Sequence, residues 1–435
     1  MSLSRLRLIL ISLLIFNLLV ACSKQHKVTS PATDDFDHIP MQTVRFANLP
    51  YADHTYSSIG VQKGWFKDVG IDLQSDTIPI ENAVASLSSG AYDVVSVPPG
   101  VLFSSYDTAP DLCSFVFGDL FQGFAIMAQP GHGYKTYTEF RASGMSHSGA
   151  IRAVVGQMRG KTFAYPTENA IKPFIDLALQ EGGLTRRDIK SLVLDDPLAV
   201  SAMRNKQADF QVGGVPSRIA LQKEGFIPIL RSVDLAKAAQ PSPDSKELAS
   251  ILQNGWAMKK ERYHSDPALA LRMASVNYRI MKFMSTNRDE AVSIHMAYLS
   301  KVTGQKFTAE DGRIIYNDLD PFVSFEDQKP WFHDGKDPLY YANVNGAILN
   351  SFVEDKIYKK PPPTVDDVIF ADDTYRELER LKSATDGLLG KLAPQADSDG
   401  RLSREIAEAK RFYDIYDYYD AYRLASGASQ GTKGR

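Results

Sequence analysis

The residues best suited to binding chemistry are polar and aromatic side chains that follow predicted β-strands. Tyr51, Asp53 and His54 come shortly after one such strand, and Thr167 and Glu168 come shortly after another. Hydroxyl, carboxyl and imidazole groups placed in this way suit a small molecule, because the carboxyl ends of parallel strands converge on one crevice. The expected chemistry is recognition by hydrogen bonds and charge, without catalysis.

The complete set of expected ligand-binding residues comes from strand ends in two separate stretches of the chain. These residues are Asn48, Tyr51, His54, Tyr56, Pro99 and Gln122 in the first stretch, and Tyr165, Thr167, Glu168, Asn169 and Gly214 in the second. Tyr51 and Tyr56 could sandwich a flat ligand, or could instead pack on the protein surface. Thr167 or Asn169 could cap a helix whose amides favour an anion, with or without touching the ligand. Glu168 instead suits an amine, an amidine or an aminopyrimidine.

The sequence lacks the residues that a metal site or a disulfide scaffold would need. The only two cysteines, Cys22 and Cys113, exclude a Cys-only zinc site and a disulfide scaffold. The eight histidines include no His-x-x-x-His pair, so no metal site and no cofactor are expected. Cys113 is flanked by Leu112, Ser114 and Phe115 and is expected to be a small buried hydrophobe.

Composition and charge exclude several classes of protein. The chain has 435 residues, of which 44% are hydrophobic, and a net charge of −3 from 49 basic and 52 acidic residues. Such a composition is that of a globular protein and excludes a collagenous or disordered chain. Because there is no large excess of positive charge, a partner that is a nucleic acid is not expected.

The elements that must position the binding residues alternate between strand and helix. Predicted strands at 43–47, 92–97, 161–165 and 208–212 are each separated by helical patterns, and the segments SLSSGAYDVVSVPPG and AMRNKQADFQVGGVP share one order of elements. This order predicts an α/β protein with two similar lobes and a mostly parallel sheet in each. We expect lobe 1 to combine residues 43–128 with 255–360, lobe 2 to hold 160–250, and a helical extension to cover 372–423.

The first 22 residues resemble a bacterial lipoprotein signal. Arg5 and Arg7 precede an apolar run that is too short to span a bilayer comfortably, and Leu-Val-Ala-Cys then ends at Cys22. We expect residues 1–21 to be removed, Cys22 to receive the lipid, and residues 22–42 to form a tether. The alternative is an uncleaved anchor with an incidental cysteine. The expected location is the bacterial cell envelope, outside the cytoplasm and anchored to a membrane.

Four motifs in order resemble one family. VRFANLPYADHTYSSIGVQKGWFKDVGIDL (44–73) is similar to its first strand and helix, SLSSGAYDVV (86–95) to its second motif, RGKTFAYP (159–166) to the opening of its second lobe, and NRDEAVSIHMAYL (287–299) to a late helix. The family is that of the extracytoplasmic solute-binding proteins of ABC importers for nitrate, sulfonates, taurine and thiamine precursors. The resemblance implies a two-lobed type II periplasmic-binding-protein fold with interleaved lobes and, here, a C-terminal helical extension.

The resemblance also implies which partners the protein has, and it leaves two alternative functions open. It implies a small-molecule solute, an ABC permease and no enzymatic activity, and the chain is expected to be a monomer. In the thiamine-pyrimidine subgroup the loop before the first helix commonly reads Asn-His, where this chain has Asp53-His54. A structural or partner-binding lipoprotein with a degenerate cleft is the main alternative, and an enzyme similar to the thiamine-pyrimidine synthases is a further one. The solute stays open between an anion and an amine.

Overall fold

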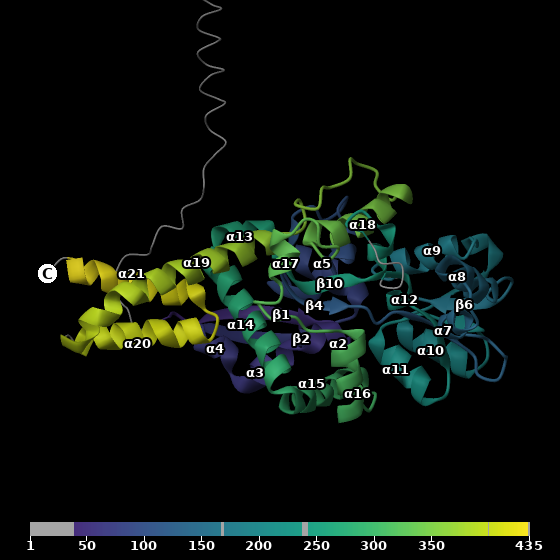
Figure 1. The fold of residues 1–435 in the computed structure, drawn as a ribbon, viewed down its shortest axis with the longest axis horizontal. Helices are drawn as coiled ribbons and strands as arrows, with labels where there is room; N and C mark the ends of the chain where they lie inside the picture. The colour runs from purple at the N-terminus through teal and green to yellow at the C-terminus, as the bar shows by residue number, and fades with distance from the viewer. Residues whose placement is uncertain (1–38, 167–168, 237–241, 399, 434–435) are drawn as a thin grey trace, which may run out of the picture. The chain divides into compact units, whose positions relative to one another are not determined.

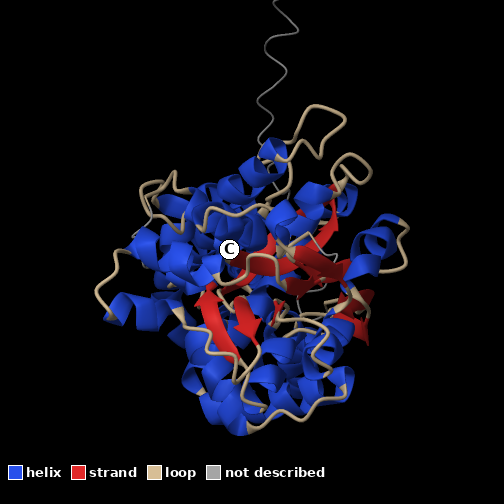
Figure 2. Cartoon of the chain, turned by 90° about the vertical axis from the view of Figure 1, so that its right-hand side faces the viewer, coloured by secondary structure: helices blue, strands red, loops and turns tan. Residues whose placement is uncertain are grey.

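The computed structural model describes residues 39–166, 169–236, 242–398 and 400–433. Within these residues, two five-stranded sheets are each covered by helices on both faces (Figures 1 and 2). We call the part built on the first sheet lobe 1 and the part built on the second sheet lobe 2. The alternation of strands and helices in the sequence therefore predicted the α/β class and the two lobes correctly.

The sheet of lobe 1 has the order β2-β1-β3-β10-β4, with β10 antiparallel to both of its neighbours. Alternating apolar residues explain the placement of β1, since Val44 and Phe46 are buried in the core. Its strands are β1 (Gln42–Asn48), β2 (Ile71–Thr77), β3 (Val94–Val97), β4 (Leu112–Phe121) and β10 (Leu252–Lys259).

The sheet of lobe 2 has the order β7-β6-β8-β5-β9. Residues 125–128 were expected in lobe 1, but they form β5 and pair antiparallel with β8 and β9, so they belong to lobe 2. The strands are β5 (Ala125–Ala128), β6 (Thr162–Tyr165), β7 (Lys190–Val193), β8 (Phe210–Gln211) and β9 (Ile227–Arg231).

The chain passes between the lobes twice, between β4 and β5 and again between β9 and β10. These two crossing segments, residues 122–124 and 232–251, make the lobes interleaved. The second segment contains α12 (Ser232–Ala236) and the short 3₁₀ helix η3 (Lys246–Ser250).

The helices of each lobe pack their apolar faces on its sheet. Trp256 on β10 is fully buried and stacks on Tyr56 with ring centroids 5.9 Å apart. The helices of lobe 1 are α2 (Ala52–Thr55), α3 (Ser57–Lys63), α4 (Trp65–Asp68), η1 (Ile80–Asn82), α5 (Ala83–Ser88), α6 (Pro99–Ser104), α13 (Lys260–Ser265), α14 (Pro267–Thr286), α15 (Arg288–Thr303), α16 (Ala309–Ile314), the π-helical turn η4 (Ile315–Leu319), α17 (Lys329–His333) and α18 (Tyr341–Glu354). Those of lobe 2 are α7 (Tyr137–Ala142), α8 (His147–Gly156), α9 (Lys172–Glu181), η2 (Arg186–Asp188), α10 (Asp196–Arg204) and α11 (Val215–Lys223).

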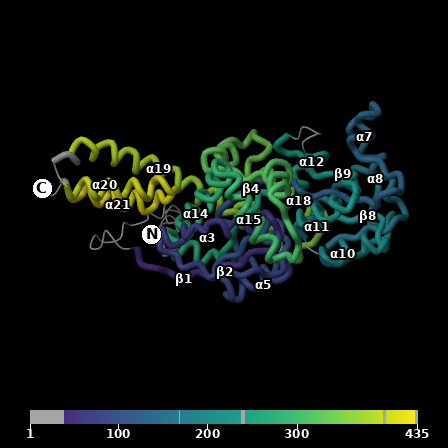
Figure 3. The backbone as a smooth tube through the Cα atoms, turned by 90° about the horizontal axis from the view of Figure 1, so that it is seen from below, coloured from purple at the N-terminus to yellow at the C-terminus, as the bar shows by residue number. Residues whose placement is uncertain are grey.

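The C-terminal helices lie on the side of lobe 1 that faces away from lobe 2 (Figures 1 and 3). They are α19 (Ala371–Leu392), the 3₁₀ helix η5 (Ala393–Ser398), α20 (Gly400–Asp414) and α21 (Tyr418–Lys433). The predicted extension, 372–423, therefore ends too early, because α21 continues to Lys433. The chain turns at Tyr416, whose φ is +69°, and α21 then continues because Leu424, Ala425 and Ala428 are buried.

A buried ion pair fixes these helices to lobe 1. Arg272 of α14 contacts Asp420 of α21 through two hydrogen bonds of 2.7 and 3.0 Å, and Asp420 is completely buried. Tyr375 of α19 donates to the carbonyl of Phe325 at 2.9 Å. The extension is therefore joined to lobe 1 through both α19 and α21. Across the described ranges, no helix combines the length and apolar character needed to cross a bilayer.

Candidate functional site

A small cavity lies where the two lobes meet. We call it the interlobe cavity, and its volume is about 20 Å³. The residues that line it are Tyr51, Asp53, His54, Ile80, Pro98, Phe121, Phe124, Ala170, Gly214 and Leu252. Such a volume holds about one water molecule. A larger solute therefore requires the lobes to separate, and it would contact both lobes when they close.

Two ionisable side chains of lobe 1, His54 and Asp53, line the cavity among apolar residues such as Ile80 and Leu252. His54 and Asp53 both belong to α2, and His54 Nε2 lies 3.2 Å from Asp53 Oδ2. His54 Nδ1 lies 2.9 Å from Ser96 Oγ at the end of β3. Burial lowers the pKa of His54 to about 3, so its imidazole is neutral at physiological pH. Between them, these contacts fix both side chains at the edge of the cavity.

Two further carboxyl groups lie behind this edge, inside lobe 1. Asn254 Nδ2 donates to Asp53 Oδ2 at 2.7 Å and also lies 3.4 Å from Asp119 Oδ2. Asp119 and Asp320 are completely buried and close enough to share a proton. Burial raises the pKa of both groups, which favours their protonated forms. A polar network thus runs from the cavity into the core of lobe 1.

The lobe 2 side is built around two adjacent glycines, Gly213 and Gly214. Gly214 N donates to Asp196 Oδ2 at 2.9 Å, and a Cβ added at Gly214 would lie 2.6 Å from Tyr51 Cδ1 and 3.3 Å from Asp196 Oδ2. The Tyr51 ring of lobe 1 therefore rests on the backbone of lobe 2, beside the Asp196 carboxyl. Burial is the main cause that raises the pKa of Asp196 to about 6, and Glu81 of lobe 1 contributes through its charge.

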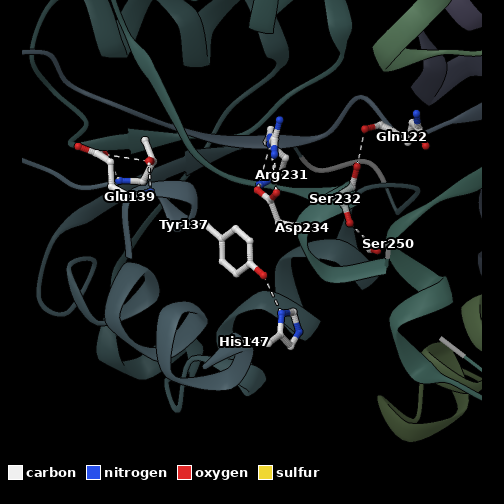
Figure 4. A network of polar contacts seen from close by, with 9 residues as sticks. Gln122, Tyr137, Glu139, His147, Arg231, Ser232, Asp234 and Ser250 are labelled. Carbon is white, nitrogen blue, oxygen red and sulfur yellow. Dashed lines mark hydrogen bonds and ion pairs between the residues drawn. The ribbon is translucent and has the colours of Figure 1, made fainter. Parts of the chain in front are cut away.

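The two crossing segments are hydrogen-bonded to one another, as Figure 4 shows. Ser232 Oγ donates to the carbonyl of Gln122 at 2.5 Å, and Ser250 Oγ donates to the carbonyl of Ser232 at 3.3 Å. Beside them, Arg231 forms a two-pronged ion pair with Asp234. Because both connections between the lobes are joined at one place, this is where a hinge motion would be centred.

Ion pairs across the lobe boundary hold the lobes together. Lys223 of α11 donates to Asp311 Oδ2 of α16 at 2.6 Å, and Lys172 of α9 pairs with Asp355, which follows α18. Asp311 also accepts from the backbone of Thr308 at the start of α16. These pairs join elements that would move apart when the lobes open.

Two other pockets lie near residues that the sequence predicted to bind a ligand. Tyr165 and Asn169 line a pocket of about 350 Å³ in lobe 2, where the Arg186 guanidinium lies 4.7 Å from the Tyr165 ring centroid. An open groove of about 800 Å³ runs between α9 and α18. The basic residues that line it are already paired, since Arg186 contacts Asp176 at 2.8 Å and Lys246 contacts Glu181 at 2.5 Å. The interlobe cavity is therefore the better candidate for ligand capture.

The structure brings three of the predicted residues, Tyr51, His54 and Gly214, to the interlobe cavity. Asn48 is not there, because its amide is buried and bonded to Ser75 and Ser57. Tyr56 is not there either, because it stacks on Trp256 in the core.

The other predicted residues lie in the hinge, beside the cavity or outside the described part. Gln122 Nε2 donates to the Asp318 carbonyl at 3.1 Å and its backbone is part of the hinge. Pro99 is buried in the first turn of α6, next to Pro98, which does line the cavity. Thr167 and Glu168 lie outside the residues that the structure describes.

Sequence reasoning missed the polar groups behind the cavity. Asp196 follows β7, and Gln211 and Asn254 lie in β8 and β10. A usable signal was present for Asp196, because the pair Asp195-Asp196 directly follows the segment SLVL (191–194), whose apolar residues favour a strand. Gln211 and Asn254 are polar residues within apolar strands, a pattern that marks a buried polar role without identifying it. Among the described residues, no group of three or more His, Cys, Asp and Glu side chains is arranged to bind a metal ion.

Comparison with solved structures finds the same architecture in several periplasmic binding proteins. The periplasmic aliphatic sulphonate binding protein SsuA from Escherichia coli is 14% identical with a TM-score of 0.55, and the match covers 78% of this chain and 99% of that one. The periplasmic nitrate-binding protein NrtA from Synechocystis PCC 6803 is 16% identical with a TM-score of 0.55, covering 78% and 88%. SsuA from Xanthomonas axonopodis pv. citri, bound to MOPS, is 13% identical with a TM-score of 0.54, covering 76% and 99%.

These likenesses establish the fold. The chain has the two-lobe type II periplasmic-binding-protein fold with added C-terminal helices, as the sequence predicted. No family model matches the sequence, and no curated protein matches it.

Proposed function

We propose that this chain is the solute-binding component of an ABC importer, which captures a small molecule between its lobes and delivers it to a permease. The observation that carries the proposal is the interlobe cavity, lined by strand ends of both lobes next to two joined crossing segments. A solute held there contacts both lobes only when they are closed, and so it favours the closed state. Binding without catalysis is the whole of the proposed activity.

The proposed location is the outer face of a bacterial membrane. It rests on the sequence alone, in which Arg5, Arg7 and an apolar run precede Leu-Val-Ala-Cys. The lipid would be attached at Cys22, and the segment from there to the start of β1 at Gln42 would tether the two-lobed part. The shared fold with proteins described as periplasmic supports this location.

A glycine substitution tests whether the interlobe cavity is where the solute binds. Gly214 has φ −66°, which any residue adopts, so Gly214→Leu adds bulk without backbone strain. Its Cβ would approach the Tyr51 ring to 2.6 Å and prevent closure. The matched control is Gly156→Leu at the end of α8, where no neighbouring atom lies within 4 Å of an added Cβ.

The measurement is native mass spectrometry and calorimetry on the full chain, purified in detergent without refolding and titrated with the small-molecule fraction of a cell extract. We expect the unmodified chain and Gly156→Leu to carry or take up the same small molecule, and Gly214→Leu to lose it. If Gly214→Leu keeps that molecule, the solute binds elsewhere. If the unmodified chain takes up no small molecule, the proposed function is wrong.

A further inference from the structure

Two buried carboxyl groups, those of Asp119 and Asp320, meet close to the first crossing segment. Asp119 lies near the end of β4, shortly before the crossing segment 122–124, and Asp320 directly follows the π-helical turn η4. Both side chains are completely buried, and they lie within hydrogen-bonding range of one another. Two carboxylates so close together in a dry interior cannot both be ionised, so the pair has to hold at least one proton.

The backbone around the pair joins β4 to the segment that contains Asp320. We call this segment, residues 318–323, the hinge strap. Leu120 N donates to the carbonyl of Pro321 at 3.0 Å, and Val323 N donates to the carbonyl of Gly118 at 2.9 Å. The hydrogen bond between the two carboxyl groups therefore adds a side-chain link to a short stretch of backbone pairing.

The hinge strap holds the first crossing segment and is connected to a contact with lobe 2. Gln122 N donates to the carbonyl of Leu319 at 2.9 Å, and Gln122 Nε2 donates to the carbonyl of Asp318 at 3.1 Å. The strap continues from α16 through η4, and α16 contains Asp311, whose Oδ2 accepts from Lys223 of lobe 2 at 2.6 Å. The position of the strap therefore affects both the hinge and an ion pair that holds the lobes together.

Among the described residues, those that act most strongly on the carboxyl pair include no cation. Besides the two carboxyl groups themselves, they are Asp53 and Asn254. The other titratable groups that face the pair are Tyr56 and Tyr316 and, through Tyr316, His295 and Arg288. The tyrosines are neutral because burial raises the pKa of each, and His295 is neutral because burial lowers its pKa to about 3. Ionisation of the pair thus adds a negative charge to the interior of lobe 1, where Asp53 opposes it.

The sign of the pH dependence follows from burial. Burial raises the pKa of Asp320 to about 7, and it also raises the pKa of Asp119. The folded chain therefore keeps protons that the unfolded chain loses near pH 4. The stabilising contribution of the protonated pair is complete below that pH and is lost as the pH rises through about 7.

We infer that Asp119 and Asp320 form a pH-sensitive latch at the hinge. While the pair is protonated, it ties the hinge strap to β4 and keeps the first crossing segment and the Lys223–Asp311 contact in the closed arrangement. Loss of a proton leaves a buried negative charge that hydration relieves, so the strap separates from β4 and the lobes move apart. The inference rests on the proposed function only for the purpose of this motion, which is to admit and release the solute.

Hydrogen exchange measured by mass spectrometry tests the latch on the full chain in detergent, at pH 5 and pH 8.5, with rates corrected for intrinsic exchange. We expect exchange in peptides that cover 118–123 and 318–323 to rise at least ~10-fold, the factor for one pH unit above a pKa of about 7. The double variant Asp119→Asn/Asp320→Asn cannot ionise at these positions and should show no such rise. The control is Asp111→Asn, which removes an exposed carboxyl just before β4 and should behave like the unmodified chain.

The distance between the lobes is the second readout. Spin labels at Gln62→Cys of α3 in lobe 1 and Leu198→Cys of α10 in lobe 2 occupy exposed positions, whereas Cys113 is completely buried and should not be labelled. We expect double electron–electron resonance to give longer distances at pH 8.5 than at pH 5, and no change with pH in the double variant. If the double variant does not fold, Asp320→Asn replaces it, because its amide can donate to Asp119 at every pH.

The possible outcomes separate the latch from the proposed function. Exchange that does not change with pH, or that rises equally in the unmodified chain and in the variant, overturns the latch. Faster exchange at pH 8.5 without a change in the distance between the lobes overturns the link to the hinge, and the inference fails with it. None of these results bears on the solute-binding function, which is decided by the uptake of a small molecule. A chain that takes up no small molecule refutes that function, and the latch is still judged by exchange and distance.

Discussion

Replacing Asp196 with asparagine should stabilise the protein at neutral pH. Burial raises the pKa of this carboxyl from 3.8 to about 6, so the folded state holds the proton more tightly than the unfolded state does. Asparagine has the same shape, and its Oδ1 can still accept from Gly214 N in place of Asp196 Oδ2. The substitution therefore removes the buried charge and keeps the hydrogen bond to the glycine loop.

The sign and size of the effect follow from proton linkage. Where the folded state binds more protons, the free energy of unfolding falls as pH rises. The cost of ionising Asp196 is absent below pH 4, develops between pH 4 and 6, and is complete above about pH 6. At about 1.36 kcal/mol per pH unit, the rise from 3.8 to about 6 corresponds to roughly 3 kcal/mol.

The assay is urea unfolding followed by tryptophan fluorescence, for the unmodified chain and for Asp196→Asn, at intervals from pH 4 to pH 7.5. We expect no difference between the two near pH 4 and a gain of up to roughly 3 kcal/mol for the variant at pH 7.5. Asp111→Asn, which removes an exposed carboxyl, serves as the control and should show no such rise. A difference that does not change with pH, or a variant less stable at pH 7.5, would refute the reasoning.

Two further predictions concern the ends of the chain. Arg272→Met should lower the free energy of unfolding by about 3 kcal/mol, because it breaks the buried ion pair with Asp420. This value is the low end for such a pair, since Asp420 keeps its 2.9 Å contact with Arg423. A urea titration that shows no loss of stability would mean that the pair does not hold α21 to lobe 1. Cys22→Ser should abolish lipid attachment, as measured by the mass of the N-terminal peptide, and a mature chain that begins elsewhere than residue 22 would contradict the signal assignment.

The sequence predicted the fold well because its signals are local. The alternation of strands and helices was sufficient to predict two α/β lobes. Gly64 ends α3 with φ +75°, a backbone conformation that favours glycine, and α4 begins at the next residue. The misplacement of 125–128 had a different cause, since a short apolar strand fits either sheet and only its non-local pairing with β8 and β9 decides.

The site was harder to predict because its groups come from distant positions. Strand ends pointed to Tyr51, His54 and Gly214, which line the interlobe cavity, but they do not say which side of a strand end faces the other lobe. Asn48 shows the difficulty, since it stands at the end of β1 and yet its side chain bonds inward to Ser57. Side chains within a strand alternate between the two faces, so one residue of register separates a ligand contact from a core contact.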